Sequence, residues 1–242
     1  MKFYDCATAP SPRRVRIFLA EKGIAVPTVQ VNLRAGEQFT PAFRAVNPDC
    51  TVPVLELDDG VRITDAIGIC VYFEASHPEP PLMGTGAQER ALITSWQRIA
   101  EREGFYAVME AFRNATPRLE GRGLPGPLDL AQIPALAERG RARIAQFFKT
   151  MDGRLADREF VAGAYSIADM ASYPWVVPHE RQGQNLDDFP HLKRWLETIR
   201  TRPATERAYA KAKEVNPNFG QPAIRTEEER KLLFGQTAAV VK

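Results

Sequence analysis

The sequence is poor in the residues that metal centres and disulfide frameworks require. It has three cysteines, Cys6, Cys50 and Cys70, and three histidines in 242 residues. The cysteines are scattered and have neither the Cys-x-x-Cys spacing of a dithiol nor the spacing of a zinc site. We therefore expect no disulfide framework, no metal and no independent dithiol chemistry. Cys6 and Cys50 are interpreted as buried or incidental thiols.

Long apolar runs and an excess of one charge are missing as well. No hydrophobic run approaches the ~20 residues of a membrane-spanning helix, and the formal net charge is +2. A charge so balanced gives no argument for a nucleic-acid or membrane partner. The N-terminus enters a strand pattern and not a signal peptide, so a cytoplasmic location is expected. The 44% of hydrophobic and 26% of charged residues are typical of a globular protein.

The stretch from Val52 to Ala66 carries the clearest local signal of the first half. Two apolar runs flank an Asp-Asp-Gly turn, which predicts a β-hairpin, and Pro53 fits the start of its first strand because proline cannot donate to a ladder. Upstream, Ser11 is the expected N-cap of a helix whose first residue is Pro12.

Residues 1–76 thus predict the order β-α-β-α-β-β-α and a mixed four-stranded sheet. The expected elements are strands over 3–6, 26–33 and either side of the hairpin turn, and helices over 12–22, 38–45 and 66–76. A Pro- and Gly-rich segment, residues 77–86, reads as an ordered linker. A thioredoxin-sized α/β domain followed by a second domain is therefore expected.

The second half shows no strand pattern and predicts an all-α domain over 87–214. Apolar residues at helical spacing indicate long helices over 87–115 and 133–155, and Gly104 is expected to bend or divide the first. Ser166 and Asp169 have the spacing of a capping box. Shorter helices are predicted from Phe189 and Arg202. In the tail, 215–242, residues 226–235 predict a short helix with an N-cap and a closing glycine.

These features resemble the cytosolic glutathione transferases, bacterial and fungal members above all. The residues that carry the resemblance are Ser11 to Arg16 on the first helix, the segment Ile17 to Ile24, Val52-Pro53 before the third strand, and Thr64-Asp65-Ala66 at the last helix of the domain. It covers nearly all of residues 1–214. It implies a thioredoxin-like domain (βαβαββα) followed by a helical bundle, a cis peptide bond at Pro53 and a homodimer.

The resemblance also implies a glutathione site. Glutathione acts as a thiolate, and a helix N-terminus favours a nearby anion, so Ser11 is the candidate catalytic residue, although capping its own helix would also explain it. Val52 would pair with the main chain of the tripeptide, and Asp65 and the Ala66 amide would hold its γ-glutamyl end. Gln38 and Thr51 would hold the glycine end. Arg13 and Arg14 could supply positive charge near the same site, although the favoured interpretation is a solvated helix surface for each.

An electrophile pocket is expected between the two domains. Its implied lining is Ala9, Pro10, Tyr106, Phe112 and Arg139, the last aligning with an arginine of a disulfide-reducing bacterial class. The expected function is glutathione transfer to small electrophiles in detoxification, with glutathione as co-substrate. Two alternatives stay open. One is a glutathione-dependent disulfide-bond oxidoreductase, indicated by Arg139 and the segment from Tyr165 to Trp175. The other is a non-catalytic glutathione- or ligand-binding protein, indicated by Asp65 where the family usually has the longer Glu or Gln and by Ala66 where it usually has Ser.

Overall fold

A computed structural model describes residues 1–215 of the protein, and the helix predicted over 226–235 lies outside them. The described residues form two compact units. Within the described residues, the first contains Met1–Arg90, Pro125–Pro127 and 200–215, and the second contains Ala91–Leu124 and Leu128–Ile199. The domain boundaries expected from the sequence remain predictions. No helix in residues 1–215 is both long enough and apolar enough to span a membrane.

A four-stranded mixed sheet lies at the centre of the first unit, in the order β2-β1-β3-β4. The strands are β1 (Lys2–Asp5), β2 (Thr28–Gln30), β3 (Val54–Glu56) and β4 (Arg62–Ile63). β1 pairs parallel with β2 and antiparallel with β3, and β4 pairs antiparallel with β3. The predicted mixed sheet is confirmed. The strand expected over 26–33 is shorter, however: it ends at Gln30, and it starts only after Pro27, which has no N–H to give to the ladder.

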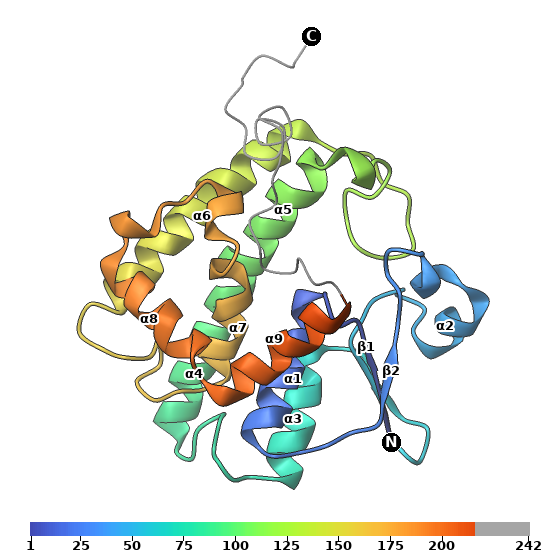
Figure 1. Cartoon of the computed structure of the whole chain (residues 1–242), viewed down its shortest axis with the longest axis horizontal. Coiled ribbons are helices and arrows are strands. Elements are labelled where there is room, and N and C mark those ends of the chain that lie inside the picture. The colour runs from blue at the N-terminus through green and yellow to red at the C-terminus, as the bar shows by residue number, and fades with distance from the viewer. Residues whose placement is uncertain (216–242) are drawn as a thin grey trace. The chain divides into compact units, whose positions relative to one another are not determined.

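Helices cover both faces of this sheet. α1 (Pro10–Glu21) and α3 (Ala66–Ser76) lie on one side, and α2 (Pro41–Val46) lies on the other (Figure 1). The helix expected over 38–45 is divided into a 3-10 turn, Glu37–Phe39, and α2. The reason is Thr40, whose side chain accepts the Phe43 N–H and caps α2.

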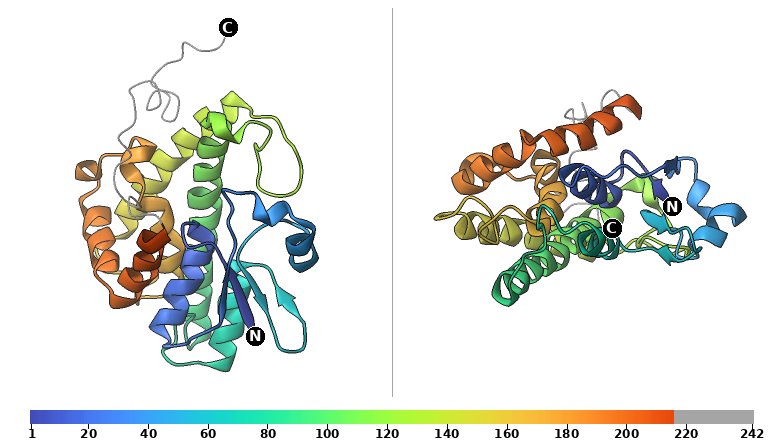
Figure 2. Two further views of the ribbon diagram at one scale, coloured as in Figure 1. Left: turned by 45° about the vertical axis from the view of Figure 1, so that its right-hand side comes forward. Right: turned by 90° about the horizontal axis from the view of Figure 1, so that it is seen from below.

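α9 (Pro203–Val215) belongs to the first unit, although it follows the helical second half in the sequence. It lies alongside α1 in every view (Figures 1 and 2). Ala204, Ala208 and Ala212 are buried, and their spacing of four residues puts them on one face of the helix. Such small side chains allow a close approach to a neighbouring helix.

The second unit is helical. α4 (Ala87–Ile99) starts in the first unit and continues through a π-helical segment, Ala100–Phe105, into α5 (Tyr106–Ala115). α6 (Pro134–Arg154) runs beside α5 (Figure 1), and α7 (Ile167–Val176) and α8 (Pro190–Arg200) follow. The π-helical segment contains Gly104, so the predicted division of the long helix there is confirmed. A Cβ at Gly104 would lie 3.1 Å from both Phe147 and Trp175, which explains the absence of a side chain.

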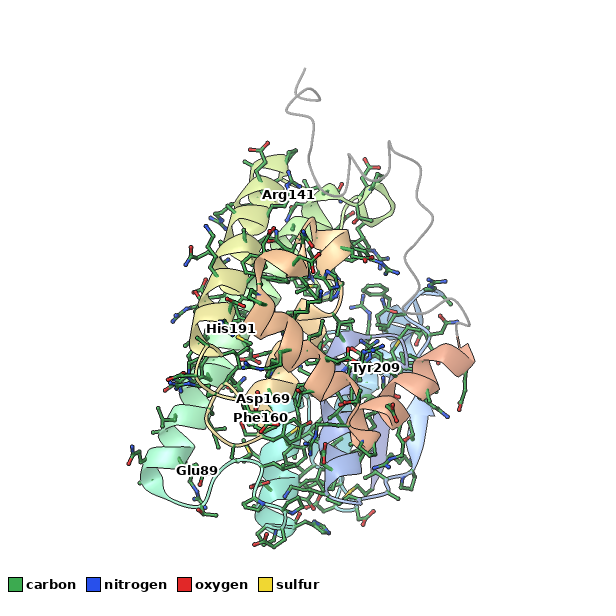
Figure 3. The ribbon with its side chains drawn as sticks, turned by 60° about the vertical axis from the view of Figure 1, so that its left-hand side comes forward. Glu89, Arg141, Phe160, Asp169, His191 and Tyr209 are labelled. Atoms are coloured by element: carbon green, nitrogen blue, oxygen red, sulfur yellow. The ribbon has the colours of Figure 1, made fainter. Side chains whose placement is uncertain are left out.

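α7 forms the centre of the second unit, and all ten of its residues are buried. The predicted capping box at its start is confirmed: the Ser166 and Asp169 side chains each accept a backbone N–H. Asp169 also accepts the Val161 N–H at 3.1 Å and the Trp195 indole N–H at 2.9 Å. Figure 3 shows Asp169 beside the loop that carries Phe160. One carboxylate therefore joins α7, this loop and α8.

Candidate functional site

α1 begins earlier than the sequence predicts, which changes the place of Ser11. Ala9 is the N-cap, in an extended conformation, and no side chain caps the helix. Pro10 is the first helical residue and Ser11 the second, so the prediction of Ser11 as N-cap is wrong. Both prolines fit the first turn, because a residue there has no intrahelical hydrogen bond to lose.

The first turn of α1 leaves few donors for an anion, and Ser11 carries them. A helix start leaves four N–H groups outside its own ladder, but Pro10 and Pro12 have none. The Ala9 N–H already bonds to the Cys6 carbonyl at 2.9 Å. The backbone N–H of Ser11 stays outside the helix ladder, and its hydroxyl lies on the same residue. This pair of donors can bind a thiolate at the positive end of the helix dipole.

The two arginines after Ser11 are buried. Arg13 is 5% exposed and Arg14 is 4% exposed, so the interpretation of a solvated helix surface is wrong for both. The reason is that α1 is covered by α3 on one side and by α9 on another, which the pattern of a single helix does not reveal. Arg14 Nη2 lies 3.4 Å from the Ser11 hydroxyl, so a cation lies next to the candidate thiolate site.

The peptide bond between Val52 and Pro53 is cis, the isomer that the family resemblance implies. Val52 precedes β3, whose ladder with β1 ends at the pair Tyr4–Val54. The N–H and C=O of Val52 therefore lie beyond the ladder, where an extended peptide can pair with them. Val52 and Ala9 belong to one packed cluster. The structure thus brings the start of α1 and the Val52–Pro53 bond together.

Asp65 is the N-cap of α3, a role that the sequence reasoning did not assign. Its Oδ1 accepts the N–H groups of Ile67 and Gly68, each at 2.8 Å. The Ala66 N–H takes part neither in this cap nor in the helix ladder, whose first bond comes from Ile69. Asp65 Oδ2 takes no part in the cap either. The start of α3 thus has one backbone N–H and one carboxylate oxygen outside the cap. Together they can bind the carboxylate and the ammonium group at an amino-acid end of a ligand.

Gln38 and Thr51, the candidates for the glycine end, differ in their surroundings. Gln38 is 7% exposed, and its buried Oε1 has no hydrogen-bond partner in the described chain. Thr51 is held by Asn47, whose Nδ2 donates to the Thr51 carbonyl at 2.9 Å and to its hydroxyl at 3.1 Å. Between them, Cys50 has a φ of 55°, a left-handed conformation that is uncommon outside glycine. The buried Asn47 amide thus holds Thr51 in place, a role that the sequence reasoning did not assign.

A buried charge network also went unpredicted. Asp5 is fully buried at the end of β1 and forms an ion pair with Arg16 of α1. Gln30 Nε2 donates to Asp5 at 2.8 Å, and Gln30 Oε1 accepts the Ala7 N–H at 3.0 Å. Arg16 donates to the Ala7 carbonyl at 2.8 Å. Burial lowers the pKa of the Arg16 guanidinium, while Asp5 opposes that shift. The network fixes the loop that leads into α1.

The remaining candidates for the electrophile pocket are divided between the units. Ala9 and Pro10 are partly buried in the first unit, and Tyr106 and Phe112 lie on α5 in the second. Tyr106 is 53% exposed. The Arg139 guanidinium pairs with Glu110 at 2.7 Å, and Arg143 reaches the same carboxylate at 3.2 Å. Burial alone would raise the pKa of Glu110, but hydrogen bonds from the two arginines lower it.

The cysteines are all free and buried. Burial raises the pKa of the Cys70 thiol far above its usual value, so this thiol stays protonated and unreactive at neutral pH. α3, which carries Cys70, packs against α1. Within residues 1–215, no group of His, Cys, Asp and Glu side chains could hold a metal ion.

Comparisons with known proteins agree with this geometry. Residues 8–76 match the family described as glutathione S-transferase, N-terminal domain, and residues 104–203 match glutathione S-transferase, C-terminal domain. The chain belongs to the glutathione S-transferase superfamily. Its thioredoxin-like sheet and helical second half are the fold of that superfamily.

Individual relatives cover most of the chain. It is similar to glutathione S-transferase 2 of Saccharomyces cerevisiae, with 33% identity over 86% of this chain and 88% of the relative. It is 26% identical to the disulfide-bond oxidoreductase YfcG of Escherichia coli, over 85% of this chain and 93% of that protein. The crystal structure of a glutathione S-transferase domain-containing protein from Marinobacter aquaeolei shares 36% identity over 85% of this chain and 100% of that chain, with a TM-score of 0.77. A glutathione-related function follows from these relationships.

Proposed function

We propose that this protein is a glutathione transferase that joins the glutathione thiolate to an electrophilic carbon of a small molecule. The observation that carries the proposal is the first turn of α1. There the Ser11 N–H stays outside the helix ladder, the Ser11 hydroxyl lies on the same residue, and the Arg14 guanidinium lies 3.4 Å from that hydroxyl. Two donors and a nearby cation favour the thiolate over the thiol, because both stabilise the negative charge.

Glutathione would lie beyond the start of β3, at one end of the sheet, across the loop that contains the cis peptide bond. Val52 would form main-chain hydrogen bonds with the tripeptide, and Pro53 would hold Val52 in place. Asp65 would pair with the γ-glutamyl ammonium and the Ala66 N–H with its carboxylate. Thr51 and the buried Gln38 would face the glycine end. The unpaired Oε1 of Gln38 supports this role, because a buried acceptor is costly until it finds a donor.

In the reaction, the thiol proton leaves to solvent and the sulfur lone pair attacks the electrophilic carbon. A new C–S bond forms while the leaving group departs with the electrons of the bond that breaks. Ser11 would donate to the sulfur before the attack and keep it oriented. Ala9, Pro10, Tyr106, Phe112 and Arg139 are the residues that we propose for the electrophile.

A parallel assay tests the proposal. Glutathione binding is titrated by calorimetry, conjugation is measured with a chloronitrobenzene, and disulfide reduction is measured with hydroxyethyl disulfide. Conjugation supports a transferase, while binding without turnover would support a non-catalytic glutathione-binding protein. No detectable binding of glutathione would contradict every form of the proposal.

The Ser11→Ala variant tests the thiolate contact. Loss of the hydroxyl should raise the pKa of the bound thiol and reduce turnover by about tenfold or more, since a hydrogen bond to a charged group contributes roughly 1.5–3 kcal/mol. The backbone N–H stays, so some activity should remain. An unchanged thiol pKa and an unchanged turnover would remove Ser11 from catalysis.

A glutathione-dependent disulfide-bond oxidoreductase is the second candidate. The similarity to the Escherichia coli disulfide-bond oxidoreductase favours it. The engagement of Arg139 with Glu110 provides a specific test, because an Arg139→Gln variant should lose disulfide reduction selectively if that side chain contacts the disulfide. Activity with hydroxyethyl disulfide that exceeds conjugation would favour this candidate.

We also propose a homodimer. α3 supports it, because this apolar helix leaves Val71 49% exposed, and Val61 of the neighbouring hairpin is 52% exposed. A dimer that covered both side chains would remove their apolar surface from water. A Val71→Glu variant should shift the sedimentation equilibrium towards monomer. The cytoplasmic location remains a prediction from the N-terminal sequence, and the role in detoxification remains a prediction from the family resemblance.

A further inference from the structure

The loop before α1 is held by arginines of the helix that it introduces. Arg16 Nη2 donates to the Ala7 carbonyl at 2.8 Å, and Arg13 Nη2 donates to the Thr8 carbonyl at 3.0 Å. The next residue, Ala9, is the N-cap. The position of the first turn of α1 therefore depends on where these guanidinium groups lie.

Arg13 is itself held from the far end of the chain. Its guanidinium carbon lies 4.4 Å from the centre of the Tyr209 ring, and its Nη1 lies 3.4 Å from the Tyr209 hydroxyl. Figure 3 shows Tyr209 on α9. A cation over a tyrosine face is attracted to it, and more strongly when both are withdrawn from water. Arg13 is 5% exposed, so the cation of the pair is withdrawn from water, and the Tyr209 ring is partly buried.

α9 has the anchors that such a contact needs. At the opposite end of α1, Arg202 forms a bidentate ion pair with Glu21, at 2.8 and 3.1 Å. Arg207 Nη2 donates to the Ala20 carbonyl at 3.2 Å. These contacts fix α9 along α1 independently of Tyr209. The ring is thus presented to Arg13 by a helix that is already docked.

We propose that Tyr209 is a positioning residue for the thiolate site. It acts through Arg13, which holds the Thr8 carbonyl and so the Ala9–Ser11 turn. The helix α9 would then be a functional part of the glutathione site, in addition to its packing role. The effect on the thiol rests on the proposed function, whereas the effect on the loop does not.

The experiment compares Tyr209→Leu, Tyr209→Phe and Arg202→Met with the wild type. Loss of the ring in Tyr209→Leu should accelerate hydrogen exchange of the Ala9 amide, which bonds to Cys6, and should lower the thiolate fraction of bound glutathione roughly threefold to tenfold. Tyr209→Phe keeps the ring face and should stay near the wild type. Arg202→Met is the matched control, because it weakens α9 docking at the far end of α1 and should leave both readouts unchanged.

Two results would overturn the proposal. One is a folded Tyr209→Leu protein with unchanged Ala9 exchange and unchanged thiol pKa. The other is an equal change in Arg202→Met, which would show that loosening α9 anywhere has the same effect. If Tyr209→Leu does not fold, Arg13→Lys replaces it, since lysine keeps the charge but lacks the fork that reaches both Thr8 and Tyr209. A wild type that binds no glutathione would contradict the proposed function, while the Ala9 exchange would still test the role of Tyr209.

Discussion

At the scale of single residues, Asp65 combines two roles that one substitution can separate. Oδ1 caps α3 through the N–H groups of Ile67 and Gly68, and the charge is the proposed partner of the ligand ammonium. Asparagine is as good an N-cap as aspartate but carries no charge. The geometry of the cap therefore survives in Asp65→Asn while the ion pair with glutathione does not.

We expect Asp65→Asn to unfold at nearly the wild-type denaturant concentration and to bind glutathione about tenfold more weakly, because a hydrogen bond to a charged group is lost. Asp65→Ala should lose both functions and about 1 kcal/mol of stability. Urea unfolding and calorimetric titration of the three proteins check this. Unchanged affinity in the Asn variant would leave Asp65 as a helix cap only.

At the scale of elements, the contact of α5 with α6 depends on Gly140. A Cβ at this position would lie 2.6 Å from the Ala111 nitrogen and 2.7 Å from the Ala107 oxygen. Both are backbone atoms of α5 and cannot rotate away. The two helices are therefore as close as they are because residue 140 has no side chain.

Gly140→Ala should destabilise the protein by about 1–3 kcal/mol, the usual cost of overpacking. Gly153, on the same helix, is the matched control because a Cβ there meets no atom within 4 Å. Gly153→Ala should be neutral or stabilising by up to about 1 kcal/mol, from helix propensity. Thermal unfolding of both variants compares the two effects directly. Equal changes in stability would contradict the close approach of α5 and α6 at Gly140.

The end of α1 is held to the segment after α3 by a buried ammonium group. The Lys22 side chain is fully buried, and its Nζ lies 2.7 Å from the carbonyls of His77 and Pro80 and 2.8 Å from Glu74. This ammonium group thus orders the predicted linker.

Lys22→Met should cost about 3–5 kcal/mol, because it leaves the Glu74 carboxylate and two carbonyls without their cation. Lys2→Met removes a lysine from the exposed pair with Glu56 and should change stability far less. Chemical unfolding of both variants and of Lys22→Met with Glu74→Gln checks this. Recovery of stability in the double variant would support the stated cause, and a small effect of Lys22→Met alone would contradict it.

At the scale of the whole molecule, stability should depend on pH through Asp169. Burial raises the pKa of this carboxyl to about 6, although hydrogen bonds from Trp195, Val161 and Ser166 act to lower it. The unfolded chain has the ordinary pKa of about 4. Between these values the folded protein holds a proton that the unfolded chain has released, so the free energy of unfolding falls as the pH rises.

The stabilisation of the folded protein by the protonation of Asp169 is fully present below pH 4 and is lost as the pH passes about 6. The free energy of unfolding changes by about 3 kcal/mol at most. Asp169→Asn should be less stable than the wild type and should lack this part of the pH dependence. Urea unfolding at pH 4, 5, 6 and 7 measures the difference between the two proteins. A difference that does not shrink as the pH rises would contradict the raised pKa.

The sequence by itself determined the order of the elements and the family. Turn glycines, helix-start prolines and hydrophobic periodicity are local signals, and the hairpin from Val52, the division at Gly104 and the capping box at Ser166 all followed from them. The prediction failed by two residues at α1, because Ser11-Pro12 has the better capping residue, whereas the helix begins at Pro10 behind an N-cap, Ala9, that has no side-chain cap. The loop before the helix is held by Arg13 and Arg16, contacts that the local pattern does not show.

Only the tertiary structure decided which charges are buried. Arg13 meets a tyrosine 196 residues away, Lys22 meets carbonyls that follow α3, and Asp5 meets an arginine on another element. A helical period shows which residues share a face, but it does not show that a second helix will cover that face. Charged side chains are normally solvated, so their burial depends on partners that are distant in the sequence and adjacent in the fold.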